Sequence, residues 1–337
     1  MATAACGDQP PGNTYTGQDP DAAVSVDANG SDAANEPDAT VPVEMGWSRR
    51  IDFPGASGPK TAAFAVGPFG YAVVEGKTYR YDPAADHWQI VAAFPGLARR
   101  QASAYATDEA GYVIGGYYGG EFVELASVWR YTPSDDRWDQ LADFPGGTRA
   151  GAVAFFLGQR GYFGTGAGNA PGAPGFEFFN DLWQHNPTND SWLKVASLPG
   201  AGRREATGFA SATSAVVGLG YPGGGALGDI YQYNPVLDTW SNLPPLGERY
   251  LASGFALGST FYVGAGTAAN FFQQSDFYHF DEQLAAWLPD ADVGAGTITG
   301  ASSFVIDGAA YLVGAGSSAN QEVSKQTWRF GPVPATP

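Results

Sequence analysis

A tryptophan recurs six times along the chain at near-regular intervals, and this repetition constrains the fold more than any other feature. The intervals are 41, 50, 54, 48 and 47 residues between Trp47, Trp88, Trp138, Trp192, Trp240 and Trp287. When overlaid, the repeats read as a tryptophan strand, FPG or a relative, a basic residue, a small-residue strand, a Gly-Tyr strand, a variable loop and an aromatic strand closed by Asn-Pro or Asp-Pro. The chain therefore repeats one structural unit of about 50 residues.

Each unit contains four short strands. In residues 138–192, four runs of alternating or β-branched and aromatic residues are separated by Gly, Pro, Asn or Asp, which is the pattern of strands joined by turns. The 3.6-residue periodicity of a helical solenoid is absent. Four strands per repeat are typical of a propeller blade, so the sequence predicts an all-β, six-bladed β-propeller over residues 47–332.

The two ends of the repeat array complement each other. The last repeat reaches Trp328 and stops before supplying its own tryptophan strand, while an extra copy of that strand, WSRRIDFPG, begins at Trp47. We therefore expect residues 47–53 to complete the C-terminal blade and close the ring. Residues 333–337 then form a short C-terminal tail.

Residues 1–46 differ in composition from the repeats. They contain eight acidic residues and no Lys or Arg, among Ala, Pro, Gly, Ser and Thr, which predicts a disordered acidic tail or tether. The whole chain has a formal net charge of −17, and removing the eight tail acids leaves 34 − 8 = 26 acids against 17 bases, a net of −9. Nucleic acid is therefore not expected as a partner.

The tail suggests two roles. The sequence TAAC at Cys6 resembles the end of a bacterial lipoprotein signal, which would make Cys6 a lipidation site and the tail a tether, although Thr3 stands where leucine is usual. This predicts an extracytoplasmic protein, periplasmic, outer-membrane-anchored or extracellular, that contacts a membrane only through that lipid. The alternative is an unpaired cysteine in a disordered arm. Segments AAVSVDA and VPVEM could also add a strand to a neighbouring molecule and build a homopolymer.

A basic residue recurs on the predicted rim where the loop after the second strand meets the turn after the fourth. The Arg-x-x-Ala pattern aligns four arginines, doubled in two blades by Arg100 and Arg204, with Lys60 close by in the first blade: Arg99, Arg149, Arg203 and Arg249. Two interpretations are open. Guanidinium groups suit a carboxylate or phosphate ligand, but a repeated arginine after a turn also suits hydrogen bonding to an adjacent blade.

The variable loops place aromatic residues on the same rim. The ligand-binding candidates among them are Tyr117, Phe122, Phe176, Phe179, Tyr221 and Phe272. Aromatic rings beside arginines suit a sugar ring or a protein hot spot. Glu75, which replaces a glycine in the short EGKT loop of the first blade, is the weak candidate for a catalytic residue; it is a general base or a charge partner.

Other chemistry finds little support. The three histidines fall at different repeat positions in alternate blades, so converging metal ligands are not expected. The single cysteine lies outside the repeats, which excludes an internal disulfide and a cysteine metal cluster. No Gly-x-Ser-x-Gly nucleophile motif occurs. We expect no metal and no cofactor.

The segments FPGGTRAGAVAF, GYFGTG and NDLWQHNPTNDSW resemble the repeat of secreted bacterial kelch proteins, often labelled galactose-oxidase-like. The copper chemistry of galactose oxidase does not carry over, because the repeats lack a cysteine and converging histidines. FPGGTR at 144–149 is also similar to the repeat of bacterial sialic acid mutarotases, six-bladed kelch isomerases. That resemblance implies a glutamate and an arginine at the pore mouth, mapped here only loosely onto the rim arginines with Glu75 or Glu177.

The sequence as a whole favours an extracytoplasmic binding module that recognises an acidic glycan or protein ligand through its arginine and aromatic rim. One alternative is a sugar-acid mutarotase or isomerase, and another is a structural protein that self-assembles through its N-terminal tail. Catalysis is left open.

Overall fold

Short antiparallel strands make up most of the described part of the chain. The computed structural model describes residues 44–55, 61–119, 123–172, 175–294, 298–314 and 325–333, all of which belong to the unit Val43–Pro337. None of these residues forms a helix long and apolar enough to cross a membrane.

The described strands form six four-stranded antiparallel sheets, here called sheets 1 to 6. From the inner to the outer strand, sheets 1 to 3 consist of β2 (Ala62–Val66), β3 (Phe69–Val74), β4 (Lys77–Asp82) and β5 (His87–Ile90); β6 (Ser103–Ala106), β7 (Gly111–Ile114), β10 (Val128–Thr132) and β11 (Arg137–Gln140); and β13 (Val153–Leu157), β14 (Arg160–Gly164), β17 (Leu182–Asn186) and β18 (Ser191–Val195). Sheets 4 to 6 consist of β19 (Thr207–Ala210), β20 (Ala215–Gly218), β21 (Ile230–Asn234) and β22 (Thr239–Leu243); β24 (Ser253–Leu257), β25 (Thr260–Gly264), β27 (Phe277–Asp281) and β28 (Ala286–Asp290); and β29 (Ser302–Ile306), β30 (Ala309–Val313), β31 (Thr327–Pro332) and β1 (Met45–Arg50).

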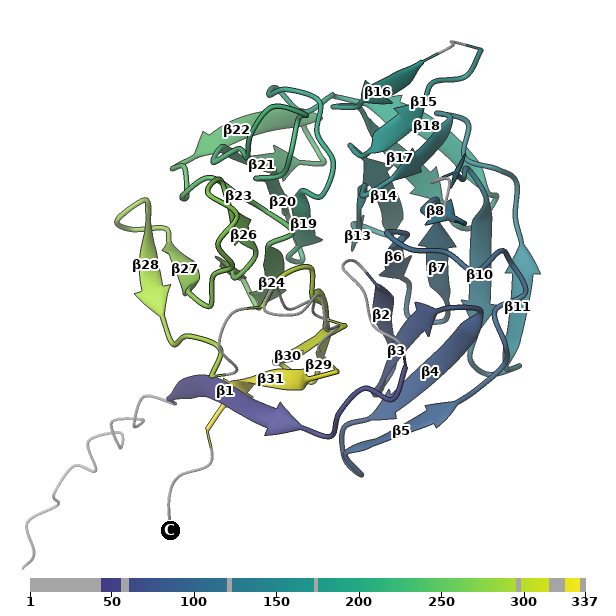
Figure 1. Cartoon of the computed structure of the whole chain (residues 1–337), viewed down its shortest axis with the longest axis horizontal. Helices are drawn as coiled ribbons and strands as arrows, with labels where there is room; N and C mark the ends of the chain where they lie inside the picture. Colours follow the sequence, from purple (N-terminus) through teal and green to yellow (C-terminus); the bar gives the residue numbers. More distant parts are fainter. Residues whose placement is uncertain are drawn as a thin grey trace, which may run out of the picture. The chain divides into compact units, whose positions relative to one another are not determined.

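The inner strands surround a narrow central channel. They contact one another in the order β2, β6, β13, β19, β24, β29 and back to β2, and Figure 1 shows the sheets following one another around this centre. The channel has a volume of about 80 Å³ and is lined by small residues of all six inner strands: Ala63, Ser103, Ala154, Thr207, Ser253 and Ser303. Small side chains are required there because the six strands converge.

The N-terminal strand lies beside the C-terminal one. β1 pairs with β31 from Met45↔Pro332 to Arg50↔Thr327, and Figure 1 shows the purple β1 next to the yellow β31. The strand begins two residues before Trp47, whose ring lies 4.9 Å from both Phe277 and Phe330. Trp47 therefore fixes sheet 6 against sheet 5 as well as supplying its outer strand.

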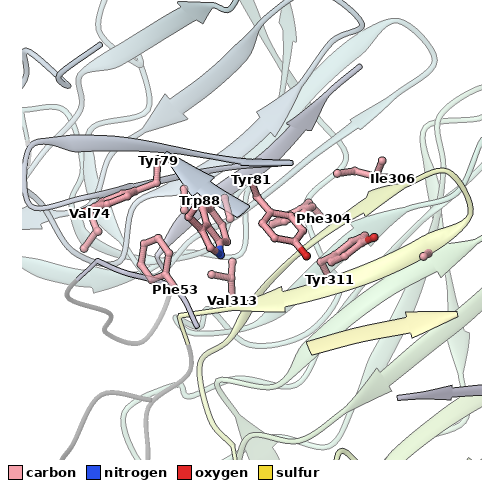
Figure 2. Close-up of a cluster of buried hydrophobic side chains, with 12 residues drawn as sticks. Phe53, Val74, Tyr79, Tyr81, Trp88, Phe304, Ile306, Tyr311 and Val313 are labelled. Carbon is pink, nitrogen blue, oxygen red and sulfur yellow. The ribbon is translucent and has the colours of Figure 1, made fainter. Parts of the chain in front are cut away.

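Neighbouring sheets interlock through an aromatic ring and a glycine. The ring of Phe64 in sheet 1 covers Gly111 of sheet 2 so closely that a Cβ there would overlap it, and Phe304 of sheet 6 covers Gly70 of sheet 1 in the same way. The recurring Gly-Tyr strand thus needs its glycine for close approach of the next sheet. Figure 2 shows the contact between sheets 6 and 1, where Tyr81 and Tyr311 lie 5.5 Å apart.

Small three- and two-stranded sheets extend from the variable loops. They are β12 (Thr148–Ala150) with β15 (Ala167–Asn169) and β16 (Phe176–Phe178), β23 (Arg249–Tyr250) with β26 (Thr267–Ala268), and β8 (Tyr117–Tyr118) with β9 (Val123–Glu124). The variable loops are therefore partly hydrogen-bonded to the segments that carry the rim arginines.

Sheet 3 replaces a repeated tyrosine with histidine. In sheets 1, 2 and 4 this tyrosine donates to a turn aspartate, as Tyr131 does to Asp136 at 2.6 Å, whereas sheets 5 and 6 have Phe280 and Phe330 at the position. In sheet 3, His185 Nε2 lies 2.9 Å from Asp190 Oδ1 and its Nδ1 lies 2.5 Å from the hydroxyl of Tyr105. Tyr105 occupies an inner-strand position that is Phe64, Phe155, Phe209, Phe255 or Phe304 elsewhere, so the two substitutions are matched across the boundary between sheets 2 and 3.

This buried pair predicts a loss of stability in mild acid. Burial lowers the pKa of His185 below its ordinary value of 6.5, against the opposing hydrogen bond and charge of Asp190. Because the unfolded chain binds a proton more readily, the contribution of neutral His185 is complete above pH 6.5 and decreases as the pH falls toward the lower pKa of the folded state.

The double variant Tyr105→Phe with His185→Tyr introduces the phenylalanine and tyrosine that face each other across three other sheet boundaries, as Phe64 and Tyr131 do between sheets 1 and 2. We expect its free energy of unfolding to vary less between pH 7 and about 5 than that of the parent, measured by urea denaturation across that range. An unchanged pH dependence would show that His185 does not control it.

Candidate functional site

The four aligned rim arginines lie inside the sheets. Arg99, Arg149, Arg203 and Arg249 expose at most 6% of their surface. In each, Nη1 donates to the carbonyl sixteen residues further along the chain, over distances of 3.0 to 3.3 Å. Their guanidinium groups therefore do not converge at the rim, and they do not bond to the adjacent blade either; each side chain bonds to the loop of its own sheet.

A carboxylate pairs with three of these arginines. It comes from the aspartate directly before the third strand of the sheet: Asp181 for Arg149, Asp229 for Arg203 and Asp276 for Arg249. Arg203 Nη2 donates to Asp229 Oδ2 at 2.8 Å. Sheet 2 has Ser127 at that position, 2.9 Å from Arg99 Nη1, and burial lowers the pKa of Arg99 to about 10 against the opposing charge of Asp143.

The backbone of the same arginines joins neighbouring sheets. Arg203 N donates to Phe179 O at 3.0 Å, and Gly166 N donates to Arg203 O at 2.7 Å. Arg149 and Arg249 make equivalent bonds to the sheet before them. The residue thus links two sheets through its backbone and orders one loop through its side chain.

The residues two positions after the aligned arginines, and after Ile298 in the sixth repeat, form backbone hydrogen bonds that connect one sheet to the next. Each of these five residues precedes an alanine of the channel wall, and we call them the mouth residues: Gln101, Gly151, Glu205, Leu251 and Gly300. From Gly151 onward, each of the four N–H groups donates to the carbonyl of the preceding member over 2.6 to 3.0 Å. All five have positive φ, between 51° and 67°, so the backbone at this end of the channel is held in one strained conformation.

The side chains of two mouth residues, Gln101 and Glu205, form a hydrogen bond beside Gly151. Gln101 Nε2 donates to Glu205 Oε1 at 2.8 Å, although the residues belong to sheets 2 and 4. Gly151 lies between them; a Cβ there would lie 3.4 Å from Gln101 Oε1 and 3.2 Å from the Cβ of Arg204. Glycine therefore allows this contact and its own φ of 63°.

Beside this pair lies a pocket of about 310 Å³, the sheet 3 hollow. Its wall consists of Gln101, Tyr117, Glu124, Ala150, Ala167, Phe176, Arg204 and Glu205. The hollow exists because sheet 3 carries Ala150 opposite Ala167. At the equivalent positions, sheets 2 and 4 carry the bridged pairs Arg100↔Tyr117 and Arg204↔Tyr221.

Arg204 differs from the buried arginines in its contacts. Its side chain is 38% exposed and its Nε lies 3.8 Å from Glu205 Oε1, beyond hydrogen-bonding distance. Its guanidinium lies 5.6 Å from the Tyr221 ring and makes no hydrogen bond with a residue in the described ranges. Glu205, in contrast, is almost buried, with 8% of its side chain exposed.

The remaining predicted residues fall into three groups. Tyr117 and Phe176 line the sheet 3 hollow, and Tyr221 stacks beneath Arg204. Phe179 stacks on buried Arg149 at 4.1 Å, while Phe272 is 70% exposed and lies away from the hollow. Lys60, Phe122 and Cys6 lie outside the described residues.

The predicted glutamates lie at the surface. Glu75 is 53% exposed, 3.9 Å from Arg100 Nη2, and Glu177 is exposed on β16. The sequence did not single out Gln101 and Glu205. They could have been found from the repeat alignment, because the residue two positions after each aligned arginine differs between repeats while the residues around it recur.

Metal binding finds no support in the described ranges. There, no group of three or more His, Cys, Asp or Glu side chains is placed to hold a metal ion. His185 pairs with Asp190 and His279 with Asp290 at 3.1 Å, each within its own sheet.

Comparison with known proteins identifies the repeat. The family model of the kelch motif matches residues 98–145, which cover the junction between sheets 1 and 2 and all four strands of sheet 2. A search of curated proteins found no match. Among solved structures, the one titled "Structure of YjhT" is similar with a TM-score of 0.71 and 16% identity, covering 82% of this chain and 95% of that chain.

These findings define the class of protein. The chain is all-β and is a kelch-type β-propeller, as the sequence predicted. At 16% identity, the likeness to the solved structure concerns the fold. Function must be argued from the residues around the sheet 3 hollow.

The buried ion pairs predict that removing a carboxylate partner destabilises the protein and that adding one stabilises it. Asp229→Ala leaves the charge of Arg203 buried without a carboxylate, and we expect a loss of about 3–5 kcal/mol in the free energy of unfolding. Ser127→Asp gives Arg99 the partner that the other sheets have, and we expect a gain of about 1.5 kcal/mol. Both are measured by urea denaturation at pH 7. A change below about 1 kcal/mol in Asp229→Ala would contradict a structural role for the arginine.

Proposed function

We propose that the sheet 3 hollow binds a sugar that carries a carboxylate, and that the protein acts as a binding module. The observation that carries this proposal is Arg204, which lines the hollow and, among the described residues, has a buried Nε without a hydrogen-bonded partner and forms only a 3.8 Å ion pair with Glu205. Buried donors such as this Nε normally have partners. A ligand carboxylate is the acceptor that matches guanidinium geometry best.

The rest of the wall suits a sugar ring. Tyr117 and Phe176 supply aromatic surface for the apolar face of a ring, and the Gln101–Glu205 pair supplies a donor and acceptors for hydroxyl groups. The volume of about 310 Å³ lies at the lower end of the range of small-molecule sites, about 300–1,000 Å³. An acidic peptide would use Arg204 but would leave the amide and carboxylate of the mouth with fewer partners.

A mutarotase is the second candidate, and Glu205 is the observation that favours it. Exchange of sugar anomers requires a group that takes a proton from the anomeric hydroxyl and a group that gives one to the ring oxygen. Glu205 places a nearly buried carboxylate in the hollow beside Arg204. Faster exchange between anomers of a bound sugar, measured by NMR, and its loss in Glu205→Gln would establish this activity.

The cellular context is proposed from the sequence. We propose an extracytoplasmic protein in which the acidic tail tethers the propeller to a lipid on Cys6, supported by the small residues before that cysteine. Self-assembly through the tail is the rival proposal. Intact-mass measurement of Cys6 in protein from its native membrane fraction and light scattering of the full chain distinguish the two.

The binding proposal predicts a specific effect of Arg204→Ala. Calorimetric titration with glucuronic and N-acetylneuraminic acids, with glucose for comparison, should show preference for the acids, and the variant should bind them about 10 to 100-fold more weakly because one charge-assisted contact is lost. Arg160→Ala is the matched control. Arg160 is the first residue of β14 and is not part of the wall of the hollow. Among the described residues, its side chain donates to the carbonyl of the adjacent Gln159.

A second variant tests the hollow itself. Ala150→Arg gives sheet 3 the residue that sheets 2 and 4 have at that position, so it should fill the hollow and abolish binding while the melting temperature stays close to that of the parent. Equal binding of glucose and the acids, or binding of tetraglutamate in place of any sugar, would show that the ligand class is wrong.

A further inference from the structure

A second hollow adjoins the proposed sugar site. It has a volume of about 370 Å³ and is lined by Glu75, Ala98, Arg99, Arg100, Tyr117, Tyr118 and Gly119; we call it the sheet 1 hollow. Tyr117 lines both hollows. Building on the proposed function, we infer that the sheet 1 hollow is a second sugar subsite, and that the ligand is an acidic oligosaccharide of at least two residues.

The sheet 1 hollow results from a short turn. In sheet 1 only Glu75 and Gly76 separate β3 from β4, whereas in sheet 2 the segment between β7 and β10 spans residues 115–127 and carries the β8 and β9 hairpin. The two turn residues have positive φ, 50° and 75°, as in the tight turns of hairpins. The short turn leaves the face of the longer sheet 2 hairpin uncovered.

Glu75 is an unusual residue for this turn. Asn, Asp and Gly are preferred where φ is positive, and other side chains adopt it at a cost. The turn directs a carboxylate toward Arg100, whose Nη2 lies 3.9 Å from Glu75 Oε1. Both side chains are more than half exposed, at 63% for Arg100 and 53% for Glu75. A pair this exposed contributes little to stability, so its donors and acceptors remain available to a ligand.

The two hollows offer the same set of groups. The sheet 3 hollow combines Arg204 with Glu205 and the Tyr117 ring, and the sheet 1 hollow combines Arg100 with Glu75 and the Tyr117 ring. Arg100 and Arg204 also occupy equivalent positions, each bridged to a tyrosine seventeen residues later. Two adjoining sites that each offer an arginine, a glutamate and an aromatic ring fit a ligand built from repeated, chemically similar units.

The arginine in each hollow makes the test selective. Digalacturonic acid should bind the parent protein at least about tenfold more tightly than galacturonic acid, because the second residue gains contacts without a second loss of freedom. Arg100→Ala should remove this gain and leave galacturonic acid binding unchanged. Arg204→Ala should weaken both ligands. Arg137→Ala, an exposed arginine on the outer strand β11, is the control.

The Arg100→Ala substitution preserves the local fold. Arg100 joins Tyr117 through two backbone hydrogen bonds of 2.9 Å, which do not involve the side chain. Equal affinity of the parent for the two ligands, or equal weakening of both by Arg100→Ala, would overturn the second subsite while the proposed function stands. If the parent protein binds neither these ligands nor glucuronic or N-acetylneuraminic acid, the proposed function fails and the second subsite fails with it; if it binds only the latter two acids, the second subsite alone is overturned.

Discussion

The buried arginine that begins sheets 2 to 5 is the interaction on which the rest of the structure depends. Its backbone N–H and C=O bond to the preceding sheet, while its guanidinium bonds to the loop of its own sheet. Burying a guanidinium is costly unless its donors are satisfied, and carbonyls with an aspartate meet this requirement in sheets 3 to 5. One residue therefore fixes the spacing of two sheets and the position of a loop. The mouth residues lie two positions later in the chain, so the same contacts help to fix their backbone.

The scaffold lies where the repeats agree, and the candidate binding surface lies where they differ. Trp, FPG, the aligned arginine and Gly-Tyr form the contacts within and between sheets. The sheet 3 hollow comes from alanines at 150 and 167, where neighbouring sheets have Arg and Tyr, and the sheet 1 hollow comes from a two-residue turn. Such differences between repeats change the surface with little loss of stability, because they leave the buried arginine–aspartate pairs unchanged.

The sequence was sufficient for the fold but only partly for the site. Tryptophan spacing and turn residues predicted the all-β architecture, since strand period and glycine position are local properties. The role of Arg149 and Arg203 was not decided, because a repeated arginine fits both a ligand rim and a structural pair until its burial is known. Glu205 and Gln101 are far apart in sequence, and their contact depends on a left-handed backbone and on Gly151 between them.

Rigidity at the channel mouth has a consequence for recognition. Backbone hydrogen bonds of 2.6 to 3.0 Å hold the mouth residues in one conformation, and the bond from Gln101 fixes the Glu205 carboxylate. A ligand would therefore meet groups that are already oriented, which reduces the entropy lost on binding. Arg204 and Arg100 remain partly exposed on this rigid base, so they can adjust to a carboxylate while the polar pair beneath them selects the arrangement of hydroxyl groups. The Gln101–Glu205 pair of the mouth would then determine which sugar is selected, and Arg204 and Arg100 would supply the electrostatic part of the binding free energy.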